Sequence, residues 1–230
     1  MKILITGASR GIGLEMAQYG MEQGWEVVAC CRHPQQAEKL LSLAQLSNGL
    51  ISVHVADMLE PPTFQALAYE LRQEAIDILI NNAGVYGSDR NQFGRVDAQD
   101  WLKTFQVNTI APLKMSEIFI ENISLGKNKV IACLSSKMGS MGDNASGGSY
   151  IYRSSKAALN AVVKSMSVDL YDKNIKCVAL HPGWVKTDMG GPNAEISTRE
   201  SVSKIFNTLL SLKIEDSGRF IDIDGEDILW

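Results

Sequence analysis

The sequence lacks the features that identify several classes of protein. Its four cysteines lie in apolar runs and contain no Cys-x-x-Cys pair, so neither a zinc site nor a redox pair is expected. The three histidines, His33, His54 and His181, are widely separated along the chain, and we assign no metal. Small buried thiols are instead typical of a protein in a reducing compartment.

Positive charge is also scarce. The chain has 22 lysines and arginines against 26 aspartates and glutamates, and its formal net charge is −4. A nucleic-acid-binding protein would carry a basic patch, and a membrane surface would attract a run of Lys or Arg. The apolar stretch Ile3-Leu4-Ile5 is too short for the core of a signal peptide. We therefore expect a cytoplasmic protein with no nucleic-acid or membrane partner.

Short β-branched runs alternate with longer segments of helical period. This alternation is typical of repeated βαβ units and of a parallel sheet covered by helices on both faces. The hydrophobic content of 45% and the length favour one α/β domain over residues 1–230. The predicted strands are 2–6, 26–31, 51–56, 78–81, 129–134, 176–180 and 219–223. The predicted helices are 12–23, 34–46, 63–74, 98–122, 150–172 and 198–212, and the glycine-rich stretch 139–148 is expected to be a loop.

A glycine-rich turn follows the first predicted strand. Gly7, Gly11 and Gly13 have the spacing G-x-x-x-G-x-G before the helix expected at Ile12. Without side chains there, backbone N–H groups and the positive end of the helix can reach a pyrophosphate. A tight turn that serves packing alone would show the same glycines. The position at the first βα junction, followed by a second strand of suitable length, favours a dinucleotide site.

The end of the second strand indicates which dinucleotide is bound. Proteins that bind NAD usually place an acidic residue there, whereas the 2′-phosphate of NADP requires cations. Arg32 ends this strand, Arg10 lies in the glycine loop, and residue 31 is a cysteine. Two guanidinium groups would bind the phosphate bidentately, so NADP(H) is predicted, although each arginine alone could be a solvated surface residue. Asp57 follows the third strand and would either accept a hydrogen bond from the adenine amino group or cap the next helix.

Tyr152 and Lys156 form a candidate acid-base pair. They are four residues apart in a predicted helix, so the hydroxyl and the ammonium share one face. A tyrosine hydroxyl has a pKa of about 10, and a fixed cation close by lowers that value. We therefore expect Lys156 to lower the pKa of Tyr152. The same spacing is common on solvated helix faces, so this interpretation depends on the motifs around the pair.

Taken together, the motifs resemble the short-chain dehydrogenase/reductase family over nearly the whole chain. The matching segments are Thr6 to Gly13, Asn81-Asn82-Ala83-Gly84, Asn108, Ser135-Ser136, Tyr152 with Lys156, and Pro182-Gly183 with Thr187. Within the family, the segments 181–191 and 220–225 are similar to the C-factor and sniffer-type carbonyl reductases. The expected fold is a doubly wound, Rossmann-type sheet of seven parallel strands in the order 3-2-1-4-5-6-7, with helices on both faces.

The resemblance also implies catalytic roles. Tyr152 would donate a proton during reduction of a carbonyl by hydride, and Ser136 would hydrogen-bond the carbonyl oxygen. Ser135 is the poorer partner because adjacent strand residues face opposite sides of a sheet. Lys156 would lower the pKa of Tyr152 and bind the nicotinamide ribose. Asn108 would hold a water that passes protons from solvent through Lys156.

The remaining contacts follow from the same resemblance. Thr187 and the backbone near Val185 would hold the nicotinamide carboxamide, whereas Pro182-Gly183 alone would indicate a plain turn. The predicted cofactor-binding residues are Gly7, Ser9, Arg10, Gly11, Ile12, Gly13, Arg32, Asp57, Met58, Asn82, Ala83, Gly84, Tyr152, Lys156, Pro182, Gly183, Val185 and Thr187. The predicted apolar substrate pocket consists of Val85, Tyr86, Met138, Trp184 and Met189, each of which would equally serve packing.

The sequence therefore predicts an NADPH-dependent oxidoreductase that reduces an aldehyde or ketone. Two alternatives remain: an NADP-binding regulatory or signalling protein of the C-factor type with little turnover, and a pteridine reductase. The complete set of Asn108, Ser136, Tyr152 and Lys156 favours an enzyme, because a binding module would not need all four. The expected partner is a small carbonyl compound. The helices predicted at 98–122 and 150–172 match those through which relatives pair, so a homodimer or homotetramer is expected.

Overall fold

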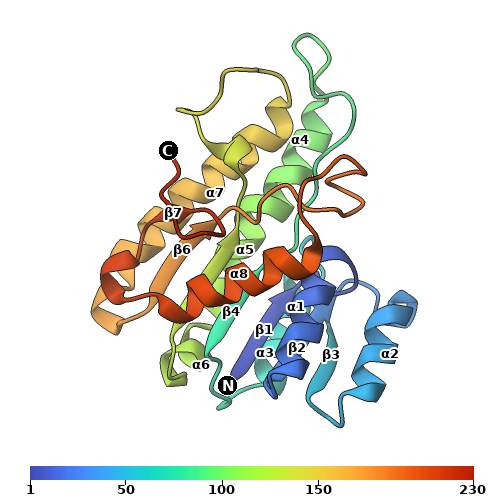
Figure 1. Cartoon of the computed structure of the whole chain (residues 1–230), viewed down its shortest axis with the longest axis vertical. Coiled ribbons are helices and arrows are strands. Elements are labelled where there is room, and N and C mark those ends of the chain that lie inside the picture. The colour runs from blue at the N-terminus through green and yellow to red at the C-terminus, as the bar shows by residue number, and fades with distance from the viewer.

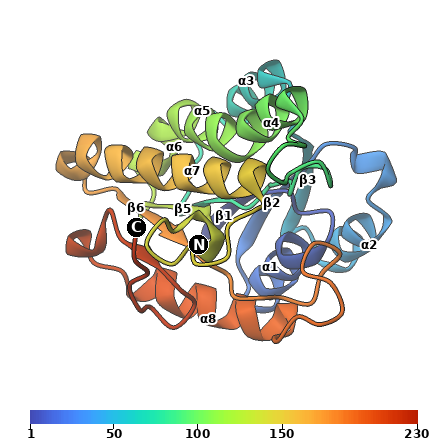
Figure 2. The same cartoon turned by 90° about the horizontal axis from the view of Figure 1, so that it is seen from above.

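Seven parallel strands form one sheet in the computed structural model, which describes residues 1–230. The strand order is β3-β2-β1-β4-β5-β6-β7, with helices on both faces (Figure 1, Figure 2). The predicted Rossmann-type fold and strand order are confirmed. The strands are β1 (Lys2–Thr6), β2 (Glu26–Cys31), β3 (Ile51–Val55), β4 (Ile78–Asn81), β5 (Val130–Leu134), β6 (Lys176–Leu180) and β7 (Phe220–Ile221).

The helices divide into two layers, which Figure 2 shows from above. One layer contains α1 (Gly11–Glu22), α2 (Glu38–Leu46) and α8 (Thr198–Ser211). The other contains α3 (Pro61–Glu70), α4 (Ala98–Phe105), α5 (Ala111–Ile118), α6 (Ile120–Leu125) and α7 (Tyr150–Asp169). None of the helices combines the length and the hydropathy that a membrane-spanning segment requires.

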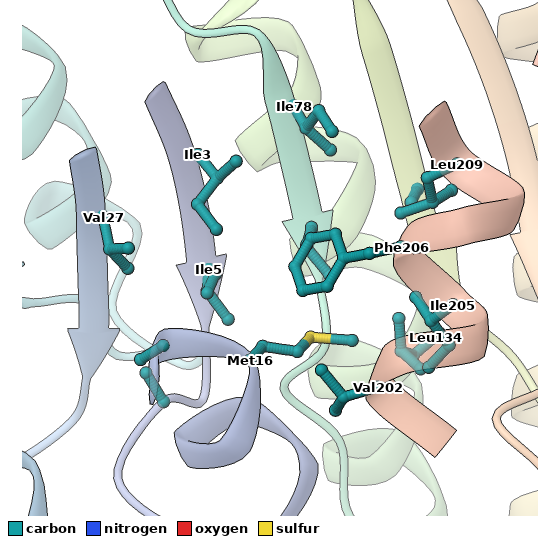
Figure 3. Packing of buried hydrophobic residues seen from close by; sticks show 14 of the residues in the cluster. Ile3, Ile5, Met16, Val27, Ile78, Leu134, Val202, Ile205, Phe206 and Leu209 are labelled. Carbon is teal, nitrogen blue, oxygen red and sulfur yellow. The ribbon is translucent and has the colours of Figure 1, made fainter. Parts of the chain in front are cut away.

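Two hydrophobic clusters lie on the two faces of the sheet. Ile3 and Ile5 of β1 pack with Met16 of α1 and Phe206 of α8 (Figure 3). Leu4, between them in the strand, belongs to the cluster on the other face. Successive strand residues point to opposite faces, so a strand covered on both sides must be apolar at each position. This explains the unbroken apolar runs of the sequence.

Most element ends agree with the sequence within one or two residues, and four helices differ. The segment predicted as one helix over 34–46 is a 3-10 turn at Pro34–Gln36 followed by α2. The helix predicted at 63–74 begins earlier, because Pro61 suits the first turn of α3, and ends at Glu70. The helix predicted at 150–172 ends at Asp169. The predicted strand 219–223 is reduced to the two residues of β7.

The predicted helix 98–122 is not continuous. After α4 the chain makes a π-helical turn over Gln106–Ile110 before α5 begins. Pro112, in the first turn of α5, has no N–H to donate to the carbonyl of Asn108 four residues earlier. Turns of this kind are frequent at functional sites, and this one carries Asn108.

Candidate active site

A cleft of about 610 Å³ runs along the carboxyl ends of the strands. All the predicted cofactor-binding residues line it except Gly183 and Val185. Val185 is buried and forms a bridge with Ile196. The sequence analysis did not identify several further lining residues, namely Leu14, Cys31, Lys39, Ala56, Leu59, Lys103, Val107, Leu134, Ser135, Lys186 and Asp188.

The glycine loop forms the floor of one part of this cleft. A Cβ atom on Gly13 would lie 2.3 Å from the carbonyl oxygen of Gly7, and one on Gly7 would lie 2.9 Å from the Cα atom of Ala83. The amide of Asn82 donates to the carbonyls of Thr6 and Gly7 at 2.8 and 3.2 Å. No side chain caps the start of α1, so its first N–H groups are available to an anion. This loop therefore fits a pyrophosphate.

Cations gather at the end of the cleft formed by the glycine loop, β2 and α2. The sequence placed Arg10 on the 2′-phosphate of the cofactor. In the structure its guanidinium donates to the carboxylate of Asp188 at 2.7 Å, and both side chains are more than three-quarters exposed. Arg32 and Lys39 also line the cleft, and no carboxylate pairs with either. Lys39 is the second residue of α2. A cation in the first turn of the helix that follows the second strand was the sequence signal that could have identified Lys39 as a cleft residue.

Asp57 lines the same part of the cleft. Its carboxylate accepts a hydrogen bond from the backbone N–H of Leu59 at 3.0 Å. The N-cap residue of α3 is Glu60, so Asp57 stabilises a turn and does not cap the helix. The predicted contact with adenine remains a prediction.

The four predicted catalytic residues are buried. Tyr152 and Lys156 line the opposite end of the cleft, whereas Ser136 and Asn108 lie behind its lining. Tyr152 and Lys156 come from α7, Ser136 follows β5, and Asn108 lies in the π-helical turn. Tyr152 and Ser136 are 8% exposed, Lys156 is 4% exposed, and Asn108 is fully buried. The ammonium of Lys156 donates to the carbonyl of Leu134 at 2.6 Å and lies 5.8 Å from the ring centre of Tyr152.

Burial shifts the pKa values of both Tyr152 and Lys156. It raises the pKa of Tyr152 to about 12, although a hydrogen bond with Ser136 acts in the opposite direction. It lowers the pKa of Lys156 to about 8. A low-dielectric site disfavours each charged form, so both groups move toward neutrality. Ser136, and not Lys156, is the group that lowers the pKa of Tyr152 here. The expected effect of Lys156 on Tyr152 stays a prediction.

The amide nitrogen and the amide oxygen of the Asn108 side chain both make structural hydrogen bonds. Its amide donates to the carbonyl of Val85 at 2.8 Å and to the hydroxyl of Ser155 at 3.0 Å. Its carbonyl oxygen accepts from the N–H of Val85 at 2.9 Å. These bonds hold the loop after β4 against the π-helical turn. The backbone carbonyl of Asn108 has no N–H donor four residues later, because residue 112 is proline.

The two serines after β5 have different partners. The hydroxyl of Ser135 donates to the amide oxygen of Asn160 in the interior. The hydroxyl of Ser136 accepts a hydrogen bond from the N–H of Met138 at 3.2 Å. Its hydrogen bond with Tyr152 lowers the pKa of Tyr152, against the effect of burial. Ser136 is thus the serine bonded to Tyr152, whereas Ser135 is the one that lines the cleft. The catalytic role of Ser136 stays a prediction.

The predicted substrate residues do not form one pocket. Val85 and Met189 line the cleft, and the ring of Tyr86 stacks on that of Tyr152. The sulfur of Met138 contacts the Tyr86 hydroxyl at 3.9 Å. Trp184 instead lines a separate cavity of about 620 Å³, together with Gly183 and His181, and its indole N–H donates to the carbonyl of Gly190 at 2.8 Å.

Thr187 lines the cleft through a loop that is internally hydrogen-bonded. Its hydroxyl donates to the carbonyl of Val185 at 3.3 Å and accepts from the N–H of Gly190 at 3.1 Å. No three His, Cys, Asp or Glu side chains come together in a group that could hold a metal ion. The arrangement can bind a dinucleotide along the cleft and present protonated hydroxyls to an atom at one end of it.

Comparison with known proteins agrees with this arrangement. The family model for short chain dehydrogenases matches residues 1–197, so the chain belongs to the short-chain dehydrogenase family, and the protein is an oxidoreductase of that family. The predicted family is thereby confirmed, and the predicted similarity to C-factor and sniffer-type proteins is confirmed by individual relatives.

Individual relatives are similar over most of the chain. The chain is 42% identical to C-signal of Myxococcus xanthus over 166 residues, covering 72% of this chain and 99% of C-signal. Among solved structures, carbonyl reductase Sniffer of D. melanogaster has a TM-score of 0.93 at 34% identity, covering 100% of this chain and 99% of Sniffer. An NADPH-bound carbonyl reductase from chicken fatty liver has a TM-score of 0.92 at 33% identity, covering 100% and 98% of the two chains.

Proposed function

We propose that the protein reduces an aldehyde or ketone with NADPH. The observation that carries this proposal is the buried pair Tyr152 and Lys156 at one end of a cleft whose other end has a glycine loop and unpaired cations, with Ser136 hydrogen-bonded to Tyr152. The similarity to two carbonyl reductases, one of them NADPH-bound, supports the same cofactor and substrate class here.

Tyr152 and Ser136 act on the carbonyl oxygen. When bound, the reduced nicotinamide supplies a hydride for the carbonyl carbon. Tyr152 donates a proton to the oxygen, and the raised pKa of about 12 keeps its hydroxyl protonated at neutral pH, as a general acid requires. Ser136 donates a hydrogen bond to the same oxygen and stabilises the charge that develops there. Hydride and proton together convert the carbonyl compound to an alcohol.

Lys156 and Asn108 restore the proton of Tyr152. The lowered pKa of Lys156, about 8, allows its ammonium to exchange a proton close to neutral pH. The same ammonium binds the hydroxyls of the nicotinamide ribose. The backbone carbonyl of Asn108 holds a water that connects Lys156 with solvent. In this scheme the π-helical turn presents the backbone carbonyl of Asn108, and the side chain of Asn108 holds the loop after β4 against that turn.

Arg32 and Lys39 would bind the 2′-phosphate of the cofactor, and Arg10 would join them when it exchanges Asp188 for the phosphate. Charge-assisted hydrogen bonds of this type favour a dianion over a hydroxyl. The glycine loop would bind the pyrophosphate, and Thr187 with Pro182 would border the nicotinamide.

A second candidate function is cofactor-dependent signalling with little turnover. The observation in its favour is the 42% identity to C-signal. It would use the same cofactor cleft and would not need the proton relay.

A substrate panel tests both candidates. Aldehydes, ketones, quinones and pterins are assayed with NADPH by loss of nicotinamide absorbance, and NADPH affinity is measured separately. Turnover of a carbonyl compound that disappears in Tyr152→Phe supports the reductase. Tight NADPH binding without turnover of any compound contradicts the reductase and favours signalling. Turnover confined to pterins would show that the substrate is a pteridine and not an aldehyde or ketone.

We further infer that residues 1–230 act as one cytoplasmic domain that forms a homodimer or homotetramer. Both hydrophobic clusters share the same sheet, which supports one domain. Leu102, Ile110 and Val168 on or beside α4 and α7 are at least half exposed, and burial in a subunit interface would cover them. Light scattering coupled to size exclusion tests this inference; a monomer at all concentrations would contradict it.

A further inference from the structure

The loop after β4 places an aromatic ring directly on the proposed general acid. The rings of Tyr86 and Tyr152 are stacked with their centres 4.6 Å apart and their planes 26° from parallel. Tyr86 comes from the loop that follows β4, whereas Tyr152 lies in the first turn of α7. Aromatic pairs in this offset arrangement attract each other beyond the area they bury.

The hydroxyl of Tyr86 is anchored at the start of α7. It shares a hydrogen bond of 3.0 Å with the hydroxyl of Ser149. Ser149 is the N-cap residue of α7, yet its side chain makes no capping bond and its backbone is left-handed, with φ 48° and ψ 40°. A serine at this position normally caps the helix, and a left-handed non-glycine residue is a local strain that surrounding contacts must maintain. The contact with Tyr86 takes the place of the cap.

The backbone on both sides of Tyr86 is also held. Val85 is bonded to the side chain of Asn108 through its N–H and its carbonyl. Gly87 has φ 86°, and a Cβ atom there would lie 2.8 Å from the Cγ2 atom of Ile151, so the loop passes close against α7. The N–H of Ser88 donates to the carboxylate of Asp100. Tyr86 is therefore fixed at its ring, its hydroxyl and its backbone.

We propose that Tyr86 is a positioning residue, which holds the ring of Tyr152 so that its hydroxyl faces Ser136. This inference rests on the proposed role of Tyr152 as general acid. Stacking against Tyr86 restricts rotation of the Tyr152 ring and covers one of its faces, which leaves the hydroxyl end for substrate. A misplacement of a reacting group by about 1 Å can lower a rate about 100-fold.

Tyr86 also contributes to the environment in which Tyr152 titrates. The titratable groups facing Tyr152 are Lys156 on its own helix and Tyr86 from the β4 loop. Removal of the Tyr86 ring would admit water to Tyr152 and so bring the pKa of Tyr152 down toward its ordinary value. A residue that lined the substrate pocket without contact to Tyr152 would change KM and leave this titration unaltered.

Three variants test the proposal. In Tyr86→Ala we expect kcat to fall about 10- to 100-fold, with the affinity for NADPH unchanged and the phenolate of Tyr152 forming at lower pH. Tyr86→Leu should behave similarly while it preserves volume. Tyr86→Phe keeps the ring and should retain kcat within about threefold, because the stack is intact. Tyr150→Ala is the matched control, since Tyr150 is exposed and its ring pairs with that of Phe93 and not with that of Tyr152.

Titration of the phenolate by ultraviolet difference separates this proposal from the proposed function. The signal of Tyr152 is isolated by comparison of each variant with the same variant carrying Tyr152→Phe. An effect of Tyr86→Ala on KM alone, with an unchanged titration, would overturn the positioning role. If the wild type reduces no carbonyl compound but the titration still shifts in Tyr86→Ala, the contact stands and the proposed reaction fails. Variants are compared only after circular dichroism and NADPH binding show that they are folded.

Discussion

The two ends of the cofactor cleft are built on different physical principles. At the end with the glycine loop, Arg10 and its partner Asp188 are 76% and 78% exposed. At the other end, no catalytic candidate is more than 8% exposed. Exposed charges are screened over about 8 Å at physiological salt, so the first end can select a cofactor by net charge with little fixed geometry. The buried end depends on fixed orientation and on desolvation, which shifts the pKa values of Tyr152 and Lys156.

The largest effect is expected at the buried end. Tyr152→Phe should lower the rate of carbonyl reduction about 10² to 10⁴-fold, as loss of a positioned general acid does. Affinity for NADPH should change less than about twofold, because the hydroxyl serves proton transfer. Steady-state rates and fluorescence titration measure the two quantities. If this variant turned over carbonyl substrate at the wild-type rate, Tyr152 would not be the general acid and another group in the cleft would donate the proton.

A large effect is also expected when the charge of the exposed end is reversed. Cys31→Asp combined with Arg32→Ala should invert the preference for NADPH over NADH. Each charge-assisted contact is worth about 1.5 to 3 kcal/mol before the discount for solvent, so the affinity ratio should change at least about tenfold. Titration of both cofactors against wild type and variant measures this ratio. If the wild type bound NADH as tightly as NADPH or more tightly, the proposed contact of Arg32 with the 2′-phosphate would be contradicted.

The pH dependence of kcat should reflect the pKa of Lys156 at the buried end of the cleft. Burial lowers the pKa of Lys156 to about 8, so its charged form is lost as the pH rises through that value. If the relay needs the ammonium, kcat falls by up to about tenfold for each pH unit above 8. Measurement of kcat from pH 6 to 10 tests this expectation. A flat profile to pH 10 would exclude Lys156 as the titrating group.

The free energy of unfolding of the cofactor-free protein should also depend on Lys156, but it should rise with pH where kcat falls. Between pH 8 and the ordinary pKa of lysine, the unfolded chain binds a proton at Lys156 that the folded chain does not, so the contribution of Lys156 to stability rises with pH. Lys156→Met removes this slope. Denaturant unfolding of the wild type and the variant at pH 7 and 10 measures the difference.

The smallest effects distinguish the cations from one another. Lys39→Gln should weaken NADPH binding a few-fold more than Arg10→Gln does, because Arg10 must first leave Asp188. An exposed ion pair contributes about 0 to 1 kcal/mol, so Asp188→Asn should strengthen NADPH binding by less than about fivefold. All three effects should shrink at high salt. Identical losses in Lys39→Gln and Arg10→Gln would show that the ion pair has no influence.

The region β1–α1–β2 was predicted within one residue at each end. Apolar runs and a glycine-rich turn are local signals, and the chemistry they indicate depends on neighbours a few residues away. The segment 98–122 was predicted as one helix and is interrupted. The periodicity there is helical throughout, and the π-helical turn is held by hydrogen bonds of Asn108 to Val85 and Ser155, which lie in other elements.

The sequence by itself determined the family, the strand order and the presence of Ser136, Tyr152 and Lys156, because the spacing of these motifs is a property of the chain. Tertiary structure alone decided that Arg10 pairs with Asp188, that Lys39 reaches the cleft, that Trp184 lies outside it, and that Tyr86 stacks on Tyr152. It also decided the direction of the pKa shift of Tyr152. Desolvation depends on every atom packed around a group, and most of those atoms belong to residues far away in the sequence.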